Sequence, residues 1–103
     1  MEHIKEVTPK EVEKIVEQDD KDTVIIDVRE DEEVAQGMIP GAKHIALGNI
    51  PDSTDKLAKD KNYILVCRSG RRSMNAAMYL DEQGFKVVNM KGGMLEWDGE
   101  VIV

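Results

Sequence analysis

One cysteine followed closely by arginines is the feature of this 103-residue sequence with the clearest chemistry. Cys67 is the only cysteine, and three of the four arginines, at positions 68, 71 and 72, follow it within five residues. A free cysteine has a pKa of about 8.5, which neighbouring arginines and a helix N-terminus lower, sometimes by several units. We therefore expect Cys67 to be largely a thiolate at neutral pH and to act as a nucleophile. A buried core cysteine, the alternative, would need no arginine cluster.

The segment after Cys67 has the composition of a loop that binds an anion. It joins an apolar strand pattern at 63–66 to a helix pattern at 73–83, and ligands of open α/β sheets bind beyond the carboxyl ends of strands. Unpaired N–H groups at a helix N-terminus, and successive N–H groups in a tight loop, both favour negative charge. Gly70 permits a turn where a side chain would clash. The predicted anion-binding residues are Arg68, Ser69, Gly70, Arg71, Arg72 and Ser73.

The three arginines of this loop have different expected roles. Arg68 and Arg71 are candidates for steering and holding an anionic donor, although a solvated basic rim fits each of them nearly as well. Arg72 is expected to start the helix, where it either braces the loop or faces the donor. Because the rest of the chain is acidic, this local positive charge should concentrate anions at the thiol.

The remaining pattern predicts strands that alternate with helices. Thr8, Pro9 and Glu11 are typical of a helix start, with a capping residue, a proline at the first helical position and the glutamate of a capping box. Short runs that are apolar on both faces indicate strands covered on both sides. Their alternation with helices predicts a mostly parallel sheet with helices on both faces. The expected strands are 23–28, 44–46, 63–66 and 86–89, and the expected helices are 9–17, 30–36, 50–59, 73–83 and 92–97.

Four segments, in this order along the chain, resemble motifs of the rhodanese-like sulfurtransferases. Residues 67–73 (CRSGRRS) resemble the active-site loop of that family, and 27–30 (DVRE) resemble its Asp-x-Arg segment. Residues 37–42 (GMIPGA) and 92–97 (GGMLEW) resemble two further elements of the family. Met38 stands where the family usually has a histidine, and we interpret the role of that histidine as structural. The resemblance implies one rhodanese-like domain over residues 1–103, an α/β fold of three layers around a five-stranded, mostly parallel sheet.

The resemblance also implies a thiosulfate or persulfide sulfurtransferase. The Cys67 thiolate would take the outer sulfur of a small anionic donor, form a persulfide and pass the sulfur to cyanide or a thiol. A thioredoxin-like or sulfur-carrier protein is a possible partner, and no cofactor is implied. Covalent catalysis of this kind divides one difficult transfer into two easier ones.

Two other functions are compatible with the loop. The chain could be a non-catalytic persulfide carrier or docking module for a partner protein. A small cysteine phosphatase is less compatible, because only four residues separate Cys67 from Arg72. The related phosphatases have five residues between their cysteine and arginine, which makes the loop wide enough to bind the oxygens of a phosphate.

Asp27 and Arg29 are supporting candidates near the same edge of the predicted sheet. Asp27 could hydrogen-bond to the loop backbone and hold the floor of the site, or equally cap the entry to a helix. Arg29 and Glu33 lie four residues apart and are expected to form an exposed ion pair, which typically contributes less than ~1 kcal/mol. A pairing of Cys67 with His44 is conceivable, although the local positive field already accounts for a thiolate.

Composition limits the remaining classes. The net charge of −7 and the pI of about 4.8 argue against a nucleic-acid or anionic-membrane partner. No apolar run approaches the ~20 residues of a membrane span, and the N-terminal residues are too polar for a secretory signal. His3 and His44 have no partner at metal-ligand spacing, so we expect no metal site. One cysteine excludes an internal disulfide, and a cytoplasmic location is the expectation.

Overall fold

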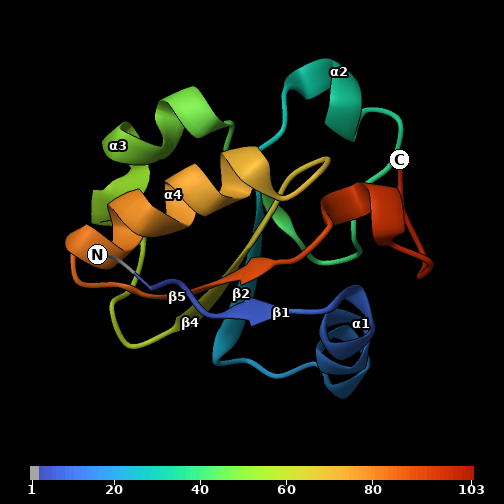
Figure 1. Cartoon of the computed structure of the whole chain (residues 1–103), viewed down its shortest axis with the longest axis horizontal. Helices are drawn as coiled ribbons and strands as arrows, with labels where there is room; N and C mark the ends of the chain where they lie inside the picture. The colour runs from blue at the N-terminus through green and yellow to red at the C-terminus, as the bar shows by residue number, and fades with distance from the viewer. Residues whose placement is uncertain (1–2) are drawn as a thin grey trace.

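A five-stranded sheet lies at the centre of the structure, a computed structural model that describes residues 3–103. The strand order is β1-β5-β4-β2-β3, and every strand pairing is parallel. This confirms the predicted α/β architecture (Figure 1). The strands are β1 (Glu6–Val7), β2 (Thr23–Asp27), β3 (Lys43–His44), β4 (Asn62–Val66) and β5 (Lys86–Met90).

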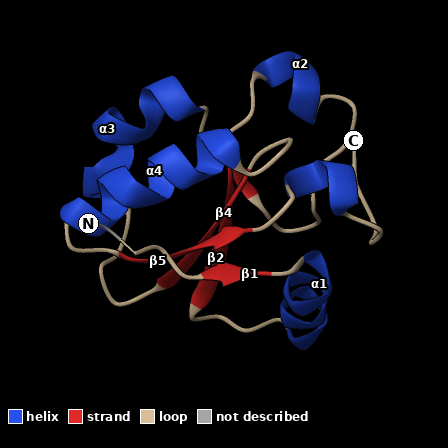
Figure 2. Ribbon diagram, viewed as in Figure 1, coloured by secondary structure: helices blue, strands red, loops and turns tan. Residues whose placement is uncertain are grey.

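Helices cover both faces of this sheet and make the fold three layers thick. Figure 2 shows α3 and α4 on one side of the strands, and α1 with the 3-10 helix η3 on the other. The α-helices are α1 (Pro9–Gln18), α2 (Asp31–Val34), α3 (Ile50–Ser53) and α4 (Arg71–Glu82). The 3-10 helices are η1 (Leu47–Asn49), η2 (Thr54–Lys56) and η3 (Gly93–Glu96). No helix within residues 3–103 is long and apolar enough to cross a membrane.

The alternation of side chains along β4 builds two separate cores. Tyr63 and Leu65 point into a core with Leu80 of α4, and Cys67, just past the strand, belongs to the same core. Ile64 and Val66 point into the opposite core with Val12 of α1. Because a strand directs successive side chains to opposite faces, a central strand buried on both sides must be apolar throughout. The thiol therefore lies on the α4 side of the sheet.

The parallel register brings the carboxyl ends of three strands to one edge. Asp27 at the end of β2 is level with Val66 at the end of β4 and with His44 at the end of β3. The loop that starts at Cys67 therefore begins beside the end of β2. This is the edge at which open parallel sheets bind their ligands.

Most helix boundaries follow the predicted signals, and the differences have local causes. The Thr8–Glu11 capping box forms with both of its hydrogen bonds, and α1 begins at Pro9. Helix α4 begins at Arg71, two residues before the predicted start, because Gly70 at φ 98° already ends the turn. Residues 50–59, predicted as one helix, form the short α3 and η2 instead.

Two strands show where the pattern was too weak. Strand β1 has only two residues, and nothing in its pattern distinguished it from the approach to α1. Strand β3 is Lys43–His44 rather than 44–46. Near the C-terminus, Met38 and Ile102 form an isolated antiparallel bridge through two backbone hydrogen bonds of 2.9 Å. Because this contact is made by the backbone, it does not depend on the side chain at position 38.

Candidate active site

Cys67 is fully buried at the end of β4, and its sulfur accepts hydrogen bonds from its own loop. The backbone nitrogen of Gly70 donates to Sγ at 3.1 Å, and the hydroxyl of Ser73 lies 3.3 Å from Sγ. Ser73 is in the first turn of α4 and is also fully buried. The short loop therefore folds back over the sulfur and directs donors at it.

These donors shift the ionisation of the thiol. Burial alone would raise the pKa of Cys67, because a charge is costly away from water. Hydrogen bonds from the Ser73 hydroxyl and from the N–H groups of Ser73, Gly70 and Ser69 outweigh burial and lower the pKa below its ordinary value. The direction matches the sequence-based expectation, but the leading stabilising contacts are hydrogen bonds rather than the arginines.

The η3 helix holds the first two loop residues from behind. The backbone nitrogens of Met94 and Leu95 donate to the carbonyl oxygens of Cys67 and Arg68, at 2.9 and 3.0 Å. This approach requires a glycine at position 93, where φ is +61° and a Cβ would overlap both of those carbonyl oxygens. The Gly-Gly motif at 92–93 thus fixes the backbone from which the active-site loop starts.

Asn89 is a buried polar residue of the site that the sequence reasoning missed. It lies in β5, beside β4, and its Oδ1 accepts from the Ser73 hydroxyl at 2.5 Å. Its Nδ2 donates to the Gly70 carbonyl oxygen at 3.1 Å and to Oε2 of Glu6 at 3.0 Å. The available signal was a polar residue near the carboxyl end of an apolar strand pattern, where no solvated face was expected.

The four arginines divide into two paired and two unpaired groups. Arg72 forms a two-pronged ion pair with Glu33 of α2, with nitrogen–oxygen distances of 2.7 and 2.8 Å. Arg29 pairs with Asp27, so the expected Arg29–Glu33 pair was wrong. Arg68 and Arg71 are exposed, and the structure gives neither an ion-pair partner within residues 3–103. Within the part of the chain that the structure describes, these last two guanidiniums remain available to an incoming anion.

Within residues 3–103, the carboxylate of Asp27 makes its hydrogen bonds to Arg29 and not to the backbone of the active-site loop, which differs from the expected role. Its carboxylate binds the Arg29 guanidinium, with Nη2 2.8 Å from Oδ2, and Oδ1 accepts from the Arg29 backbone nitrogen at 3.0 Å. It is not the helix cap either, because Glu30 occupies the N-cap of α2. Arg29 Nη2 also donates to the Gly37 carbonyl oxygen at 2.8 Å. This buried pair therefore ties the end of β2 to the turn that follows α2.

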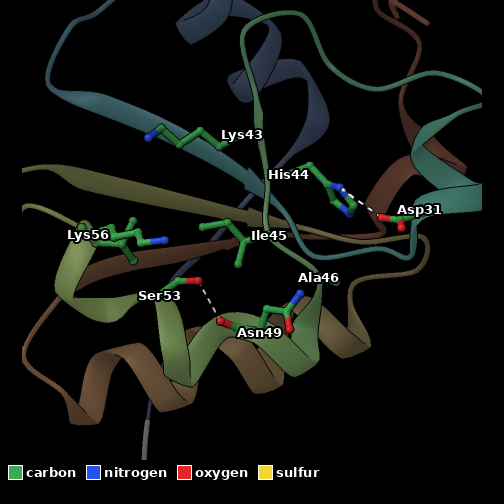
Figure 3. A pocket seen from close by; sticks show the side chains of 9 residues that line it. Asp31, Lys43, His44, Ile45, Ala46, Asn49, Ser53 and Lys56 are labelled. Carbon is green, nitrogen blue, oxygen red and sulfur yellow. Dashed lines mark hydrogen bonds and ion pairs between the residues drawn. The ribbon is translucent and has the colours of Figure 1, made fainter.

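A cavity of about 460 Å³ lies between β3 and α3, and no residue of the 67–73 loop lines it. Figure 3 shows His44 at its wall, directed towards Asp31. His44 Nε2 lies 2.7 Å from the Arg29 carbonyl oxygen, which can only accept, so Nε2 carries a hydrogen. That ring thus has partners other than Cys67. A smaller cavity of about 230 Å³ adjoins the loop and is lined by Arg29, Glu33, Gln36, Arg68, Met94 and Leu95.

The fold and this site define an α/β protein with a buried cysteine in an anion-stabilising loop after a central parallel strand. Residues 8–100 match the rhodanese-like domain family, and the chain belongs to that family. A Bacillus subtilis relative named "Putative sulfurtransferase YtwF" is 56% identical over 97 residues, which cover 94% of this chain and 93% of that protein.

Two further similarities agree with this assignment. "Putative sulfur carrier protein YrkF" of Bacillus subtilis is 42% identical over 82 residues, covering 79% of this chain and 44% of that protein. The crystal structure of a rhodanese-like domain protein from Staphylococcus aureus is 39% identical, with a TM-score of 0.88, and the match covers 97% of this chain and 98% of that one.

The Glu33–Arg72 pair should give the site a measurable acid sensitivity. The hydrogen bond from Arg72 lowers the pKa of Glu33 from 4.5 to about 2. Because the folded value is the lower one, the pair stabilises the protein fully above the unfolded value and loses this contribution as the pH falls towards 2. Replacing Glu33 by glutamine should lower the free energy of unfolding by about 1 kcal/mol at neutral pH. In urea unfolding, this difference should shrink between pH 4.5 and 2; a constant difference across that range contradicts the assignment.

Proposed function

We propose that this chain is a sulfurtransferase that carries sulfane sulfur as a persulfide on Cys67. The observation that carries the proposal is the convergence of loop hydrogen bonds on Cys67 Sγ. A thiolate is the reactive form of cysteine, and the same donors suit the terminal sulfur of a persulfide, which is also an anion. Covalent transfer through one sulfur requires no second cysteine, and the chain has only one.

The reaction balances in two steps. In the first, the Cys67 thiolate attacks the outer sulfur of thiosulfate, a new sulfur–sulfur bond forms, and sulfite leaves with the electron pair of the bond that breaks. In the second, cyanide or a thiolate attacks the outer sulfur of the persulfide and releases the Cys67 thiolate. Sγ starts and ends each cycle as an anion, and in the persulfide the negative charge lies on the outer sulfur, so hydrogen-bond donors at this loop suit both the free and the loaded protein.

The loop arginines support an anionic donor. Arg68 and Arg71 are exposed at the loop while Arg72 is held by Glu33, and the chain as a whole carries a net charge of −7. An anion is therefore attracted to this end of the sheet more than to the remaining surface. Since Cys67 is fully buried, the donor reaches Sγ only after the groups that cover the sulfur shift.

A persulfide carrier is the second candidate, favoured by the buried sulfur and by the relative that is named a sulfur carrier. In that function Cys67 would hold the sulfur for a protein partner and turn over thiosulfate negligibly. A phosphatase function has less support, because the Arg72 guanidinium is bound by a carboxylate instead of facing the loop. Turnover with a small donor separates the enzyme from the carrier.

Thiosulfate and cyanide should give thiocyanate in the presence of the wild-type protein, and Cys67→Ser should abolish this activity. Incubation with thiosulfate alone should add the mass of one sulfur atom to the wild type and none to the variant. Background turnover with a mass gain on Cys67 would instead indicate the carrier. A mass gain that persists in Cys67→Ser would show that Cys67 is not the nucleophile.

The two unpaired arginines should control the affinity for an anionic donor. Replacing both Arg68 and Arg71 by alanine should raise KM for thiosulfate about tenfold at low salt, with a smaller effect on kcat. The matched control is Lys86→Ala, which removes an exposed positive charge at the amino end of β5, the opposite edge of the sheet. The difference should shrink as salt screens the charges. An equal rise of KM in the control, or a rise of KM that does not depend on salt, contradicts this role.

A further inference from the structure

The hydroxyl of Ser73 lies between two acceptors and can serve only one of them. Its oxygen is 3.3 Å from Cys67 Sγ and 2.5 Å from Asn89 Oδ1. A serine hydroxyl carries a single hydrogen, so donation to the sulfur excludes donation to the amide. All three residues are fully buried, so water does not replace a lost donor.

The orientation of the Asn89 amide is fixed by its other two contacts. Its nitrogen lies 3.0 Å from the Glu6 carboxylate and 3.1 Å from the Gly70 carbonyl oxygen, and both of these groups only accept. A flipped amide would place its oxygen against these two oxygens. Oδ1 of Asn89 therefore faces Ser73 and requires the hydroxyl hydrogen.

The two charge states of Cys67 satisfy this network unequally. When Cys67 is neutral, its S–H can donate to Ser73, whose hydroxyl donates to Asn89, and every acceptor has a donor. When Cys67 is ionised, the Ser73 hydrogen either turns to the sulfur and leaves Asn89 without a donor, or stays and leaves the sulfur without Ser73. One buried acceptor is then unsatisfied, which disfavours the ionised state.

We propose that Asn89 is a positioning residue that opposes ionisation of Cys67 by competing for the hydrogen of Ser73. The N–H groups of the loop favour the thiolate, and Asn89 offsets part of that effect. A sulfur that ionises less readily is also the stronger nucleophile once ionised, and the most reactive attacking thiol ionises near the ambient pH. This balance would suit a sulfur that must both attack a donor and leave a persulfide. The inference rests on Cys67 being the proposed nucleophile, but its test measures ionisation and not sulfur transfer.

The charged side chains around the thiol are the same in the wild type and in the Asn89 and Ser73 variants, whose Cys67 ionisation is to be compared. They are Arg68 of the loop, Arg71 and Arg72 of α4 with Glu33 of α2, Arg29 and Asp27 at the end of β2, and Glu6 of β1 behind Asn89. Replacing Asn89 or Ser73 by an uncharged residue adds or removes no charged side chain among them. A change in the ionisation of Cys67 then reports on hydrogen bonding.

The test is the pH dependence of Cys67 alkylation by iodoacetamide in four proteins: wild type, Asn89→Leu, Ser73→Ala and the double variant. Asn89→Leu frees the Ser73 hydroxyl for the sulfur, so the midpoint should fall by about one pH unit, the equivalent of one hydrogen bond. The plateau rate at high pH should fall about threefold, since a less basic thiolate is a weaker nucleophile. In the Ser73→Ala background, Asn89→Leu should cause no further shift. As the matched control, Asn62→Leu makes the same change at the exposed amino end of β4 and should leave the midpoint unchanged.

An unchanged or raised midpoint in Asn89→Leu, or an equal shift in the presence and absence of the Ser73 hydroxyl, would overturn the proposal. If circular dichroism shows that Asn89→Leu does not fold, the proposal is tested in the wild-type protein instead. The side-chain amide resonances of Asn89 should then move with the same midpoint as Cys67 ionisation in an NMR titration. Resonances that stay fixed through that titration would refute the competition. Sulfur transfer itself can fail without affecting either outcome, so the two proposals are separately testable.

Discussion

The hydrogen bond from the Gly70 nitrogen to Cys67 Sγ, 3.1 Å long, is the contact on which the geometry of the site depends. A buried thiol resists ionisation, so the loop must supply donors at short range to reverse that preference. The loop has only three residues between Cys67 and the start of α4, and Gly70 turns the chain into α4 at φ 98° while its N–H points at the sulfur. The ionisation of the sulfur therefore depends on the short, tight turn of the loop.

The surrounding elements hold this loop from two sides. Helix η3 bonds to the carbonyl oxygens of Cys67 and Arg68, and Gly93 allows the backbone to come that close. From β5, Asn89 bonds to the carbonyl oxygen of Gly70. The carbonyl oxygens at both ends of the loop are thus held by hydrogen bonds from η3 and β5, while N–H groups of the loop remain directed at the sulfur. Preorganised donors of this kind need no rearrangement when negative charge develops.

Charge is distributed so that structure and binding use different arginines. Arg29 and Arg72 are bound by Asp27 and Glu33, and they join α2 and the end of β2 to the rest of the site. Their carboxylate partners would weaken any attraction to an external anion. Arg68 and Arg71, which are exposed and form no ion pair among the described residues, are left for that purpose. The acidic remainder of the chain increases the contrast and does not conflict with an anionic substrate.

The sequence was sufficient for those features whose cause is local. The capping box at Thr8, the apolar central strand β4 and the turn at Gly70 follow from short-range preferences, and the structure shows each of them. Partners across long separations were not predictable in this way. Glu33 and Arg72 are 39 residues apart, so spacing along a helix favoured Arg29 as the partner instead. Asn89 lies far along the chain from Cys67 and becomes its neighbour only through the pairing of β5 with β4.

The central claim is that hydrogen bonds from the loop make Cys67 an anion more readily than an ordinary cysteine. The most direct measurement is the pH at which the thiolate forms in the folded wild-type protein, followed by ultraviolet absorbance. The account predicts a midpoint below the value of about 8.5 for free cysteine. A midpoint at or above that value would contradict it, because burial would then outweigh the hydrogen bonds of Ser69, Gly70 and Ser73.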